Sequence, residues 1–273
     1  MRPIQRSIGA IGMLSVGLLG LFARSPALQA HTPPDSPIFG EEPNSFVRSF
    51  DRSQVSLTQP IEFKGKDGAP GDREDAASRN NCRATSSFLA LVPVANLSTT
   101  LAAHPTFWLY LPQPSGVVEL QLEDPTSSQT IYQTRFSGTG GPGILHFRLP
   151  ETAPDLEVGK EYRWYFFLYC NAHRESDLES DYYTISGVVR RESLTETLAS
   201  QLETATPRER ILIFAQNGLW HETLMELVAM RRASPEDARV TEDWETLFGD
   251  PLVQLEDVLS APLLDCCTSE PQE

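Results

Sequence analysis

Residues 156–164 have the sequence Leu156-Glu157-Val158-Gly159-Lys160-Glu161-Tyr162-Arg163-Trp164, in which a turn leads into an alternating run that continues to Cys170. Every second residue from Tyr162 onward is apolar, so these side chains share one face of a β-strand. The opposite face carries Glu161, Arg163, Tyr165, Phe167 and Tyr169. The run therefore predicts a strand whose second face is aromatic where a solvent-facing side would be polar.

Similar short runs recur on both sides of this strand and are separated by turn residues. They cover residues 88–92, 106–111, 117–123, 130–136, 144–149, 161–170 and 182–189. Seven strands at regular spacing, with no helical period between them, are typical of an antiparallel β-sandwich. The turn at 156–160 resembles the corner before the sixth strand of immunoglobulin-like and fibronectin-like sandwiches. We therefore expect the Tyr162 hydroxyl to bond back to the chain a few residues upstream.

The residues after this predicted sandwich have the spacing of helices. Ser193, Thr206 and Ser234 each stand three positions before an acidic residue, a pattern typical of a helix N-terminus. Gly218 and Gly249 stand where helix ends favour a left-handed residue. The sequence predicts helices over 194–203, 207–217, 219–232 and 235–248. The middle pair partly resembles a tetratricopeptide hairpin, so the fold class is mainly β with a short α-helical C-terminal module.

The N-terminus has the three zones of a secretory signal peptide. Arg2 and Arg6 precede an apolar run over 8–22, and small residues follow up to Ala30. This run is shorter than the roughly 20 residues of a spanning helix, so we expect no stable membrane span after cleavage. The protein is expected to be exported, to the periplasm or outside the cell. The expected parts are a signal peptide (1–30), a disordered or extended linker (31–81), the sandwich (82–192), the helical module (193–251) and a tail with a cysteine pair (252–273).

The charge of the chain limits its partners. Removal of residues 1–30 leaves 19 basic and 37 acidic residues, a formal net charge of −18. Because such a chain repels phosphate backbones, nucleic acid is excluded as an expected partner.

The four cysteines are Cys82, Cys170, Cys266 and Cys267. In an exported chain they are expected to be oxidised. Pairing of Cys82 with Cys170 would leave a strained ring between the two adjacent terminal residues. The alternative is that each terminal cysteine bonds one of the two in the sandwich, which would tie the tail to the domain.

Several stretches together resemble a family of exported cyanobacterial proteins called DUF928, a domain of unknown function. They are Gly68-Ala69-Pro70-Gly71 leading to Ser78-Arg79 and Cys82, Ala90-Leu91-Val92-Pro93, His104-Pro105-Thr106-Phe107-Trp108, Val158 to Trp164, Thr206-Pro207-Arg208-Glu209-Arg210, and Cys266-Cys267. The resemblance runs from Gly68 to Cys267. It implies an exported protein and assigns no reaction, ligand or catalytic residue.

Motifs for cofactor, metal and catalysis are weak. The run from Gly138 to Gly143 has the letters of a dinucleotide motif, but a predicted strand follows where the motif needs a helix, so no cofactor is expected. Asp177, Glu179 and Asp181 are a weak metal candidate, and a solvated acidic loop is the favoured interpretation. The chain has no G-x-S-x-G nucleophile motif, and we expect no enzyme.

Trp108 and Tyr110 give the strand at 106–111 a second aromatic face as well. Together with Tyr165, Phe167 and Tyr169 they form the candidate binding surface. The leading hypothesis is a non-catalytic interaction or scaffold protein with a partner protein in the cell envelope. The alternatives are a carbohydrate-binding module, in which Trp108, Tyr165 and Tyr169 would form an exposed stacking platform, and, less favoured, a hydrolase. The helices at 207–217 and 219–232 are expected to dock on the aromatic face of the strand at 161–170.

Overall fold

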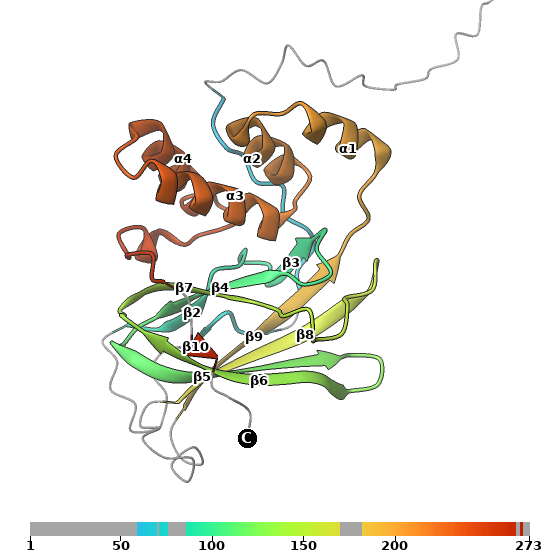
Figure 1. Ribbon diagram of the computed structural model, residues 1–273, viewed down its shortest axis with the longest axis vertical. Helices are drawn as coiled ribbons and strands as arrows, with labels where there is room; N and C mark the ends of the chain where they lie inside the picture. The colour runs from blue at the N-terminus through green and yellow to red at the C-terminus, as the bar shows by residue number, and fades with distance from the viewer. Residues whose placement is uncertain (1–58, 70, 76–85, 170–181, 266–267, 270–273) are drawn as a thin grey trace, which may run out of the picture. The chain divides into compact units, whose positions relative to one another are not determined.

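The computed structural model describes residues 59–69, 71–75, 86–169, 182–265 and 268–269, all within one compact unit. This part of the chain is mainly β, with two sheets followed by four α-helices (Figure 1).

The smaller sheet has four strands in the order β1-β2-β4-β7. They are β1 (Glu74–Asp75), β2 (Phe88–Ala90), β4 (Thr106–Leu111) and β7 (Gly143–Arg148). The larger sheet has the order β10-β6-β5-β8-β9-β3. Its strands are β10 (Thr268–Ser269), β6 (Gln129–Thr139), β5 (Ser115–Asp124), β8 (Glu161–Tyr169), β9 (Tyr182–Arg191) and β3 (Leu97–Thr100). All pairs are antiparallel except β3 with β9. The seven predicted strands are confirmed, whereas β1, β3 and β10 were not predicted.

The two sheets face each other across an apolar core. The ring of Phe107 on β4 lies 5.5 Å from that of Phe166 and 6.3 Å from that of Trp164, both on β8. Alternate residues of β5 and β8 supply this layer, as the period of two requires. At the entry to β8 the backbone N–H of Glu157 donates to the Tyr162 hydroxyl at 3.1 Å, which confirms the bond expected from the turn sequence.

The helices are α1 (Glu196–Glu203), α2 (Pro207–Gln216), α3 (Trp220–Ala233) and α4 (Ala238–Phe248), close to the predicted spans. Thr206 caps α2 in a reciprocal capping box with Glu209, as its sequence predicts. Gly218 after α2 is left-handed, with φ of +70°. The capping box starts α2, and the left-handed Gly218 ends it and turns the chain into α3.

Two of the predicted caps and one predicted helix end are wrong. Thr195 caps α1 in place of Ser193, and Asp237 caps α4 in place of Ser234. In each case the actual cap adjoins the first helical residue, where its side-chain oxygen reaches the backbone N–H groups of the first turn. Gly249 after α4 has φ of −85° and is not left-handed.

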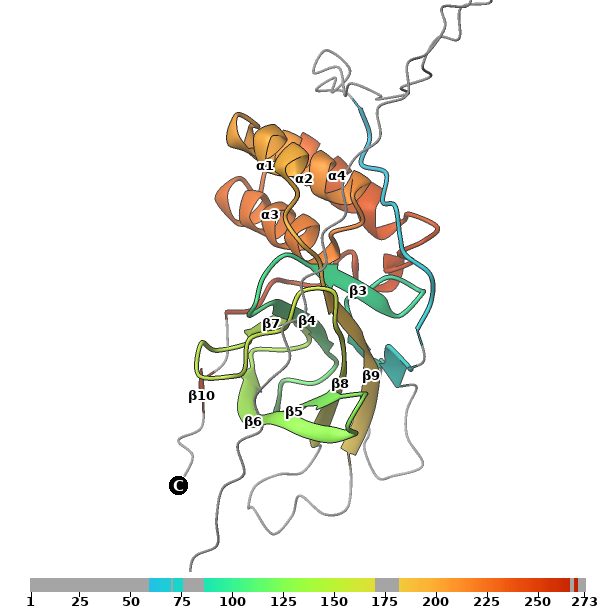
Figure 2. The same ribbon diagram turned by 90° about the vertical axis from the view of Figure 1, so that its right-hand side faces the viewer.

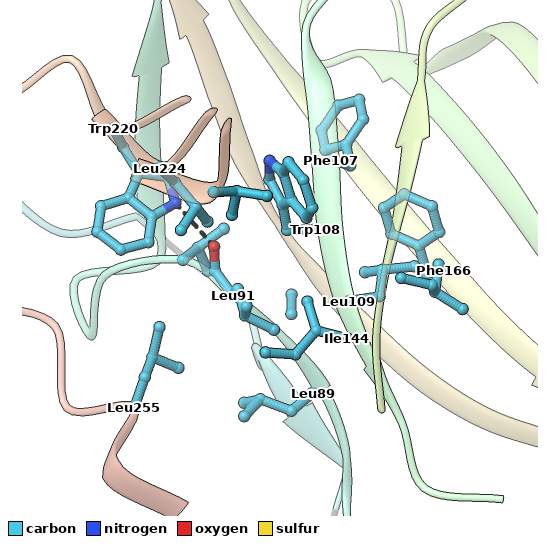
Figure 3. Close-up of a cluster of buried hydrophobic side chains, with 14 of the residues drawn as sticks. Leu89, Leu91, Phe107, Trp108, Leu109, Ile144, Phe166, Trp220, Leu224 and Leu255 are labelled. Carbon is cyan, nitrogen blue, oxygen red and sulfur yellow. Dashed lines mark hydrogen bonds between the residues drawn. The ribbon is translucent and has the colours of Figure 1, made fainter. Parts of the chain in front are cut away.

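The helices lie on the side of the four-stranded sheet that faces away from the other sheet (Figures 1 and 2). Figure 3 shows Trp220 and Leu224 of α3 against Leu91 and Trp108. The indole N–H of Trp220 donates to the carbonyl of Leu91 at 2.7 Å. Docking on the aromatic face of β8 was therefore the wrong prediction. The outward residues of β2, β4 and β7 give the helices a largely apolar surface. Docking there buries more apolar area than docking on the outward face of β8 would.

Residues 59–69 and 71–75 run extended beside these elements. Ile61 and Phe63 are buried, and the Phe63 ring lies 5.2 Å from that of Trp220. The Arg73 guanidinium donates to the carbonyl oxygens of Val92 and Val253. The side-chain burial of this stretch was not anticipated from its polar composition.

Candidate functional site

The side of the six-stranded sheet that faces away from the core is built by β5, β6, β8 and β9. In β5 the side chains of Val118, Leu120 and Leu122 are fully buried in the core, so Glu119 and Gln121 must point outward. The register then places Glu119 between Arg135 of β6 and Phe167 of β8. Cross-strand neighbours of this kind have Cβ atoms about 4.5–5.5 Å apart, close enough for their side chains to interact.

Glu119 lies at the centre of a hydrogen-bond network. Its Oε1 accepts from the amides of Gln121 at 2.6 Å and Gln133 at 2.8 Å. Its Oε2 accepts from Nε of Arg135 at 2.6 Å and from the Tyr169 hydroxyl at 3.3 Å. These side chains leave Glu119 only 2% exposed although it points away from the core. The carboxylate therefore holds four neighbouring side chains in fixed positions.

The electrostatics of this network favour a charged carboxylate. Burial alone would raise the pKa of Glu119, but the hydrogen bonds from Arg135, Gln121 and Gln133 outweigh it and bring this pKa below its usual value. Burial and the nearby charge of Glu119 raise the pKa of Tyr169 to about 12. The Tyr169 hydroxyl thus remains a hydrogen-bond donor at neutral pH.

A row of aromatic rings borders the network along β8 and β9. The rings of Tyr165 and Phe167 lie 6.4 Å apart with planes 19° apart. The ring of Tyr182 lies 5.5 Å from that of Phe167 and 5.7 Å from that of Tyr169. Tyr165 and Phe167 are half-buried, and Tyr182 is exposed. We call this surface the Glu119 face; it comprises Glu119, Gln121, Gln133, Arg135, Tyr165, Phe167, Tyr169 and Tyr182.

The structure divides the predicted binding surface into two. Tyr165, Phe167 and Tyr169 belong to the Glu119 face, whereas Trp108 and Tyr110 lie on β4 in the other sheet. Outward side chains of two packed sheets point in opposite directions, so the two groups form no common platform. Trp108 is only 5% exposed and lies against His146, with ring centroids 4.9 Å apart. An exposed stacking role for Trp108 was therefore wrong, and it was also wrong for Tyr169, which is 8% exposed.

Tyr110 lines a cavity of about 260 Å³ on the four-stranded sheet. Its hydroxyl lies 3.3 Å from Oγ of Ser86. The remaining walls come from Arg73, Glu74, Ser87, Leu89, Gln254, Leu255, Asp257 and Val258. The two carboxylates of this lining, Glu74 and Asp257, are exposed, and Arg73 is bonded to backbone carbonyls. The lining groups therefore define no single ligand chemistry.

Ser98 and His221 make a contact with the chemistry of a nucleophile and its base. Nε2 of His221 lies 2.9 Å from Oγ of Ser98, and Nδ1 lies 2.9 Å from the carbonyl oxygen of Thr106. Ser98 is completely buried between β3 and α3, and His221 is 4% exposed. A substrate cannot reach this pair in the folded chain. With Thr100, which donates to Glu222 at 2.7 Å, the pair instead joins α3 to the sheet.

The other site candidates lie outside the described residues. These are the four cysteines Cys82, Cys170, Cys266 and Cys267, together with Asp177, Glu179 and Asp181. Within the described ranges, no cluster of three or more histidine, cysteine or acidic side chains could hold a metal ion. The helices described there are all too short or too polar to cross a membrane.

Glu119, Gln121, Gln133 and Arg135 were not predicted as site residues. The alternation of β5 does predict that Glu119 and Gln121 share an outward face. The network itself depends on which strands lie beside β5 and in what register, and a single sequence does not contain this information.

Residues 74–263 match the family described as Domain of Unknown Function (DUF928). Because the match covers more than half of the 273 residues, the chain belongs to the DUF928 family. Comparison of the chain with curated proteins gave no match.

Proposed function

We propose that this chain is a non-catalytic binding protein of the cell envelope and that it binds its partner through the Glu119 face. The helical module is then an internal cover for the four-stranded sheet rather than a second binding arm. In this proposal the two sheets have separate tasks. One supports the helices, and the other presents a surface to a ligand.

The observation that carries this proposal is the different environment of the two aromatic faces. On the four-stranded sheet, Trp108 is buried beneath α3 and its neighbours. On the six-stranded sheet, Tyr165 and Phe167 keep part of their surface exposed beside a buried carboxylate. Burying a charge costs free energy unless it is fully hydrogen-bonded, and such groups often serve to fix neighbouring side chains. The Glu119 face thus has the pre-organisation of a binding surface.

The non-catalytic assignment rests on accessibility. The Ser98–His221 pair, which has the residues of a hydrolase site, is closed off by α3. Glu119 uses both oxygens as hydrogen-bond acceptors, and its depressed pKa keeps it from serving as a general acid at neutral pH. A binding role needs neither group to react.

The finer features of the fold and the compartment belong to the same proposal. The bond from Glu157 to Tyr162 supports an immunoglobulin-like sandwich, because this corner is typical of that class. The tight α2–α3 turn at Gly218 supports a relation to the tetratricopeptide hairpin. Export, cyanobacterial origin and oxidised cysteines rest on the sequence alone. Mass spectrometry of the natively produced protein should find a new N-terminus between Ala27 and His31.

Affinity capture from an envelope extract of the source organism tests the proposed function. The bait is the chain from residue 31 to 273, as wild type and as the double variant Tyr165→Ala/Phe167→Ala. The matched control is Leu194→Ala/Met225→Ala, which removes two exposed apolar side chains from the helical region. Wild type and control should retain the same protein or polysaccharide, and the Tyr165/Phe167 variant should lose it. Equal retention by all three baits would refute binding through this face.

A further inference from the structure

We infer that the ligand of the Glu119 face is an uncharged saccharide. This inference rests on the proposed function and names the chemical class of its ligand. It follows from the kinds of groups on the face, from their balance of charge and from the position of the ion pair.

The groups on the face match the two surfaces of a sugar ring. A pyranose presents C–H groups on its faces and hydroxyl groups at its rim. The π-clouds of Tyr165 and Phe167 carry a negative face, which attracts C–H groups that carry a small positive charge. Gln121 lies opposite Tyr165 in the register, and Gln133, an exposed side chain, lies opposite Gln121 on β6. An amide both donates and accepts, as a sugar hydroxyl does.

The positions of the two amides are fixed before any ligand binds. Each glutamine donates through Nε2 to Oε1 of Glu119, which also sets the direction of its carbonyl oxygen. Long polar side chains otherwise lose conformational entropy when a ligand immobilises them, which weakens binding. Anchoring through Glu119 removes most of that cost. The fixed positions matter for a hydroxyl-rich ligand. Its hydrogen bonds to the protein replace hydrogen bonds to water, so each one contributes little net free energy.

The charges on the face are balanced. Glu119 is paired with Arg135 at 2.6 Å, and Glu123 lies opposite Arg163 in the register. The whole chain has a formal net charge of −15. An anionic polymer would find no excess of basic groups and would be repelled at long range. A cationic ligand would have to compete with Arg135 and the two amides for the oxygens of Glu119. An uncharged ligand meets neither obstacle.

The position of the ion pair argues against a protein partner. The centres of protein–protein interfaces are depleted of glutamate, aspartate and lysine, whereas aromatic residues and arginine are enriched there. Here a buried glutamate, Glu119, lies within the face with Arg135 on β6, and the rings of Tyr165, Phe167 and Tyr182 lie beside this pair on β8 and β9. This arrangement suits a narrow ligand that lies along the rings and reaches the polar groups with its rim.

Isothermal titration of the chain from residue 31 to 273 tests the inference. The probes are uncharged hexasaccharides of glucose, xylose and N-acetylglucosamine, with heparin as the anionic comparison. We expect at least one uncharged probe to bind. Its Kd should rise roughly tenfold or more in Tyr165→Ala and in Gln133→Ala, and it should stay unchanged in Met225→Ala. Gln133 is an exposed side chain, so the second variant reports on binding even if the first one folds poorly.

Three results would overturn the inference. One is failure of all uncharged probes to bind, the second is tighter binding of heparin than of any of them, and the third is binding that both face variants retain. If the uncharged probes fail but the Tyr165/Phe167 variant still loses a captured protein from the extract, the saccharide assignment falls and binding through the Glu119 face stands.

Discussion

Glu119 accepts a hydrogen bond from Nε of Arg135 at 2.6 Å on a sheet surface that points away from the core. The two residues are direct cross-strand neighbours on β5 and β6. Cross-strand pairs of opposite charge stabilise a sheet, and here one member of the pair is almost completely buried. The pair also joins the polar network to the aromatic row through Tyr169.

Replacement of Glu119 by glutamine should destabilise the fold at neutral pH. The variant keeps the size of the side chain but removes the negative charge with which Arg135 is paired at 2.6 Å. Because the Arg135 side chain is 37% exposed, solvent screens part of this loss, and we expect about 1–2 kcal/mol. Urea unfolding at pH 7 measures it. Glu245→Gln, an exposed position on α4, is the control and should change stability by less than about 0.5 kcal/mol.

The same pair predicts a pH dependence. The pKa of Glu119 is lower in the folded chain than its ordinary value of 4.5, so the stabilisation is present above that value. It is lost as the pH falls through the folded-state pKa, where Glu119 takes up a proton. The difference in stability between wild type and Glu119→Gln should therefore shrink below pH 4.5. A constant difference down to pH 2 would contradict the charged state of Glu119.

His221 predicts a second loss of stability in mild acid. Burial lowers its pKa below the ordinary value of 6.5, although the charge of Glu222 partly opposes this. The unfolded chain therefore takes up a proton first, and the free energy of unfolding decreases as the pH drops below about 6.5. His221→Gln should be less stable than wild type at pH 8 but should lose less stability between pH 8 and 5.5. Met225→Ala, one turn further along α3, should show the full wild-type loss.

The hydrogen bond from Trp220 to the carbonyl of Leu91 is expected to contribute to the stability of the docked helices. Trp220→Phe keeps an aromatic ring but leaves the buried carbonyl of Leu91 without its donor. An unsatisfied buried acceptor costs about 1–3 kcal/mol. Thermal unfolding should show a lower Tm for this variant. Met225→Ala, which is 46% exposed in the same helix, should melt like wild type. Equal melting of both variants would mean that the bond does not hold α3 on the sheet.

The sequence predicted seven of the strands, β2 and β4 to β9, and all four helices because both follow local patterns. The corner at Tyr162 and the capping box at Thr206 were predictable for the same reason, since each is made within a few residues. The short strand β3 could not be predicted. Its residues Leu97–Thr100 include Ser98, Thr99 and Thr100, whose buried side chains bond to groups at the start of α3 and in the turn before it.

The site was predictable in part for a related reason. The aromatic face of β8 is visible in the alternation, and the sequence therefore predicts that Tyr165, Phe167 and Tyr169 share one face. The sequence does not indicate that β4 and β8 lie in different sheets, so Trp108 and Tyr110 were grouped with them. The sequence predicts docking of the helices on β8 because its outward aromatic rings would otherwise be exposed to water. The helices pack instead on the four-stranded sheet, whose outward apolar residues on β2 and β7 include Leu89 and Ile144.

Removal of the helical module should expose the surface that it covers. A chain ending at Arg191 would present Trp108, Leu89 and Leu91 to water, and we expect a sharply lower Tm or aggregation. Differential scanning calorimetry with size-exclusion chromatography measures both. A truncated chain that stays monomeric and melts like wild type would show that the helices are not needed as a cover.

Hydroxyl-radical footprinting of the chain from residue 31 to 273 tests the central claim most directly, because it reports the accessibility of individual side chains. Aromatic side chains and methionine are oxidised readily, so Tyr165, Phe167 and Tyr182 report on the Glu119 face and Met225 reports on the helical module. In the presence of an envelope extract, or of a saccharide that binds, oxidation of the three aromatic residues should fall while that of Met225 stays unchanged. Protection of Met225 with unchanged oxidation of Tyr165, Phe167 and Tyr182 would contradict the account.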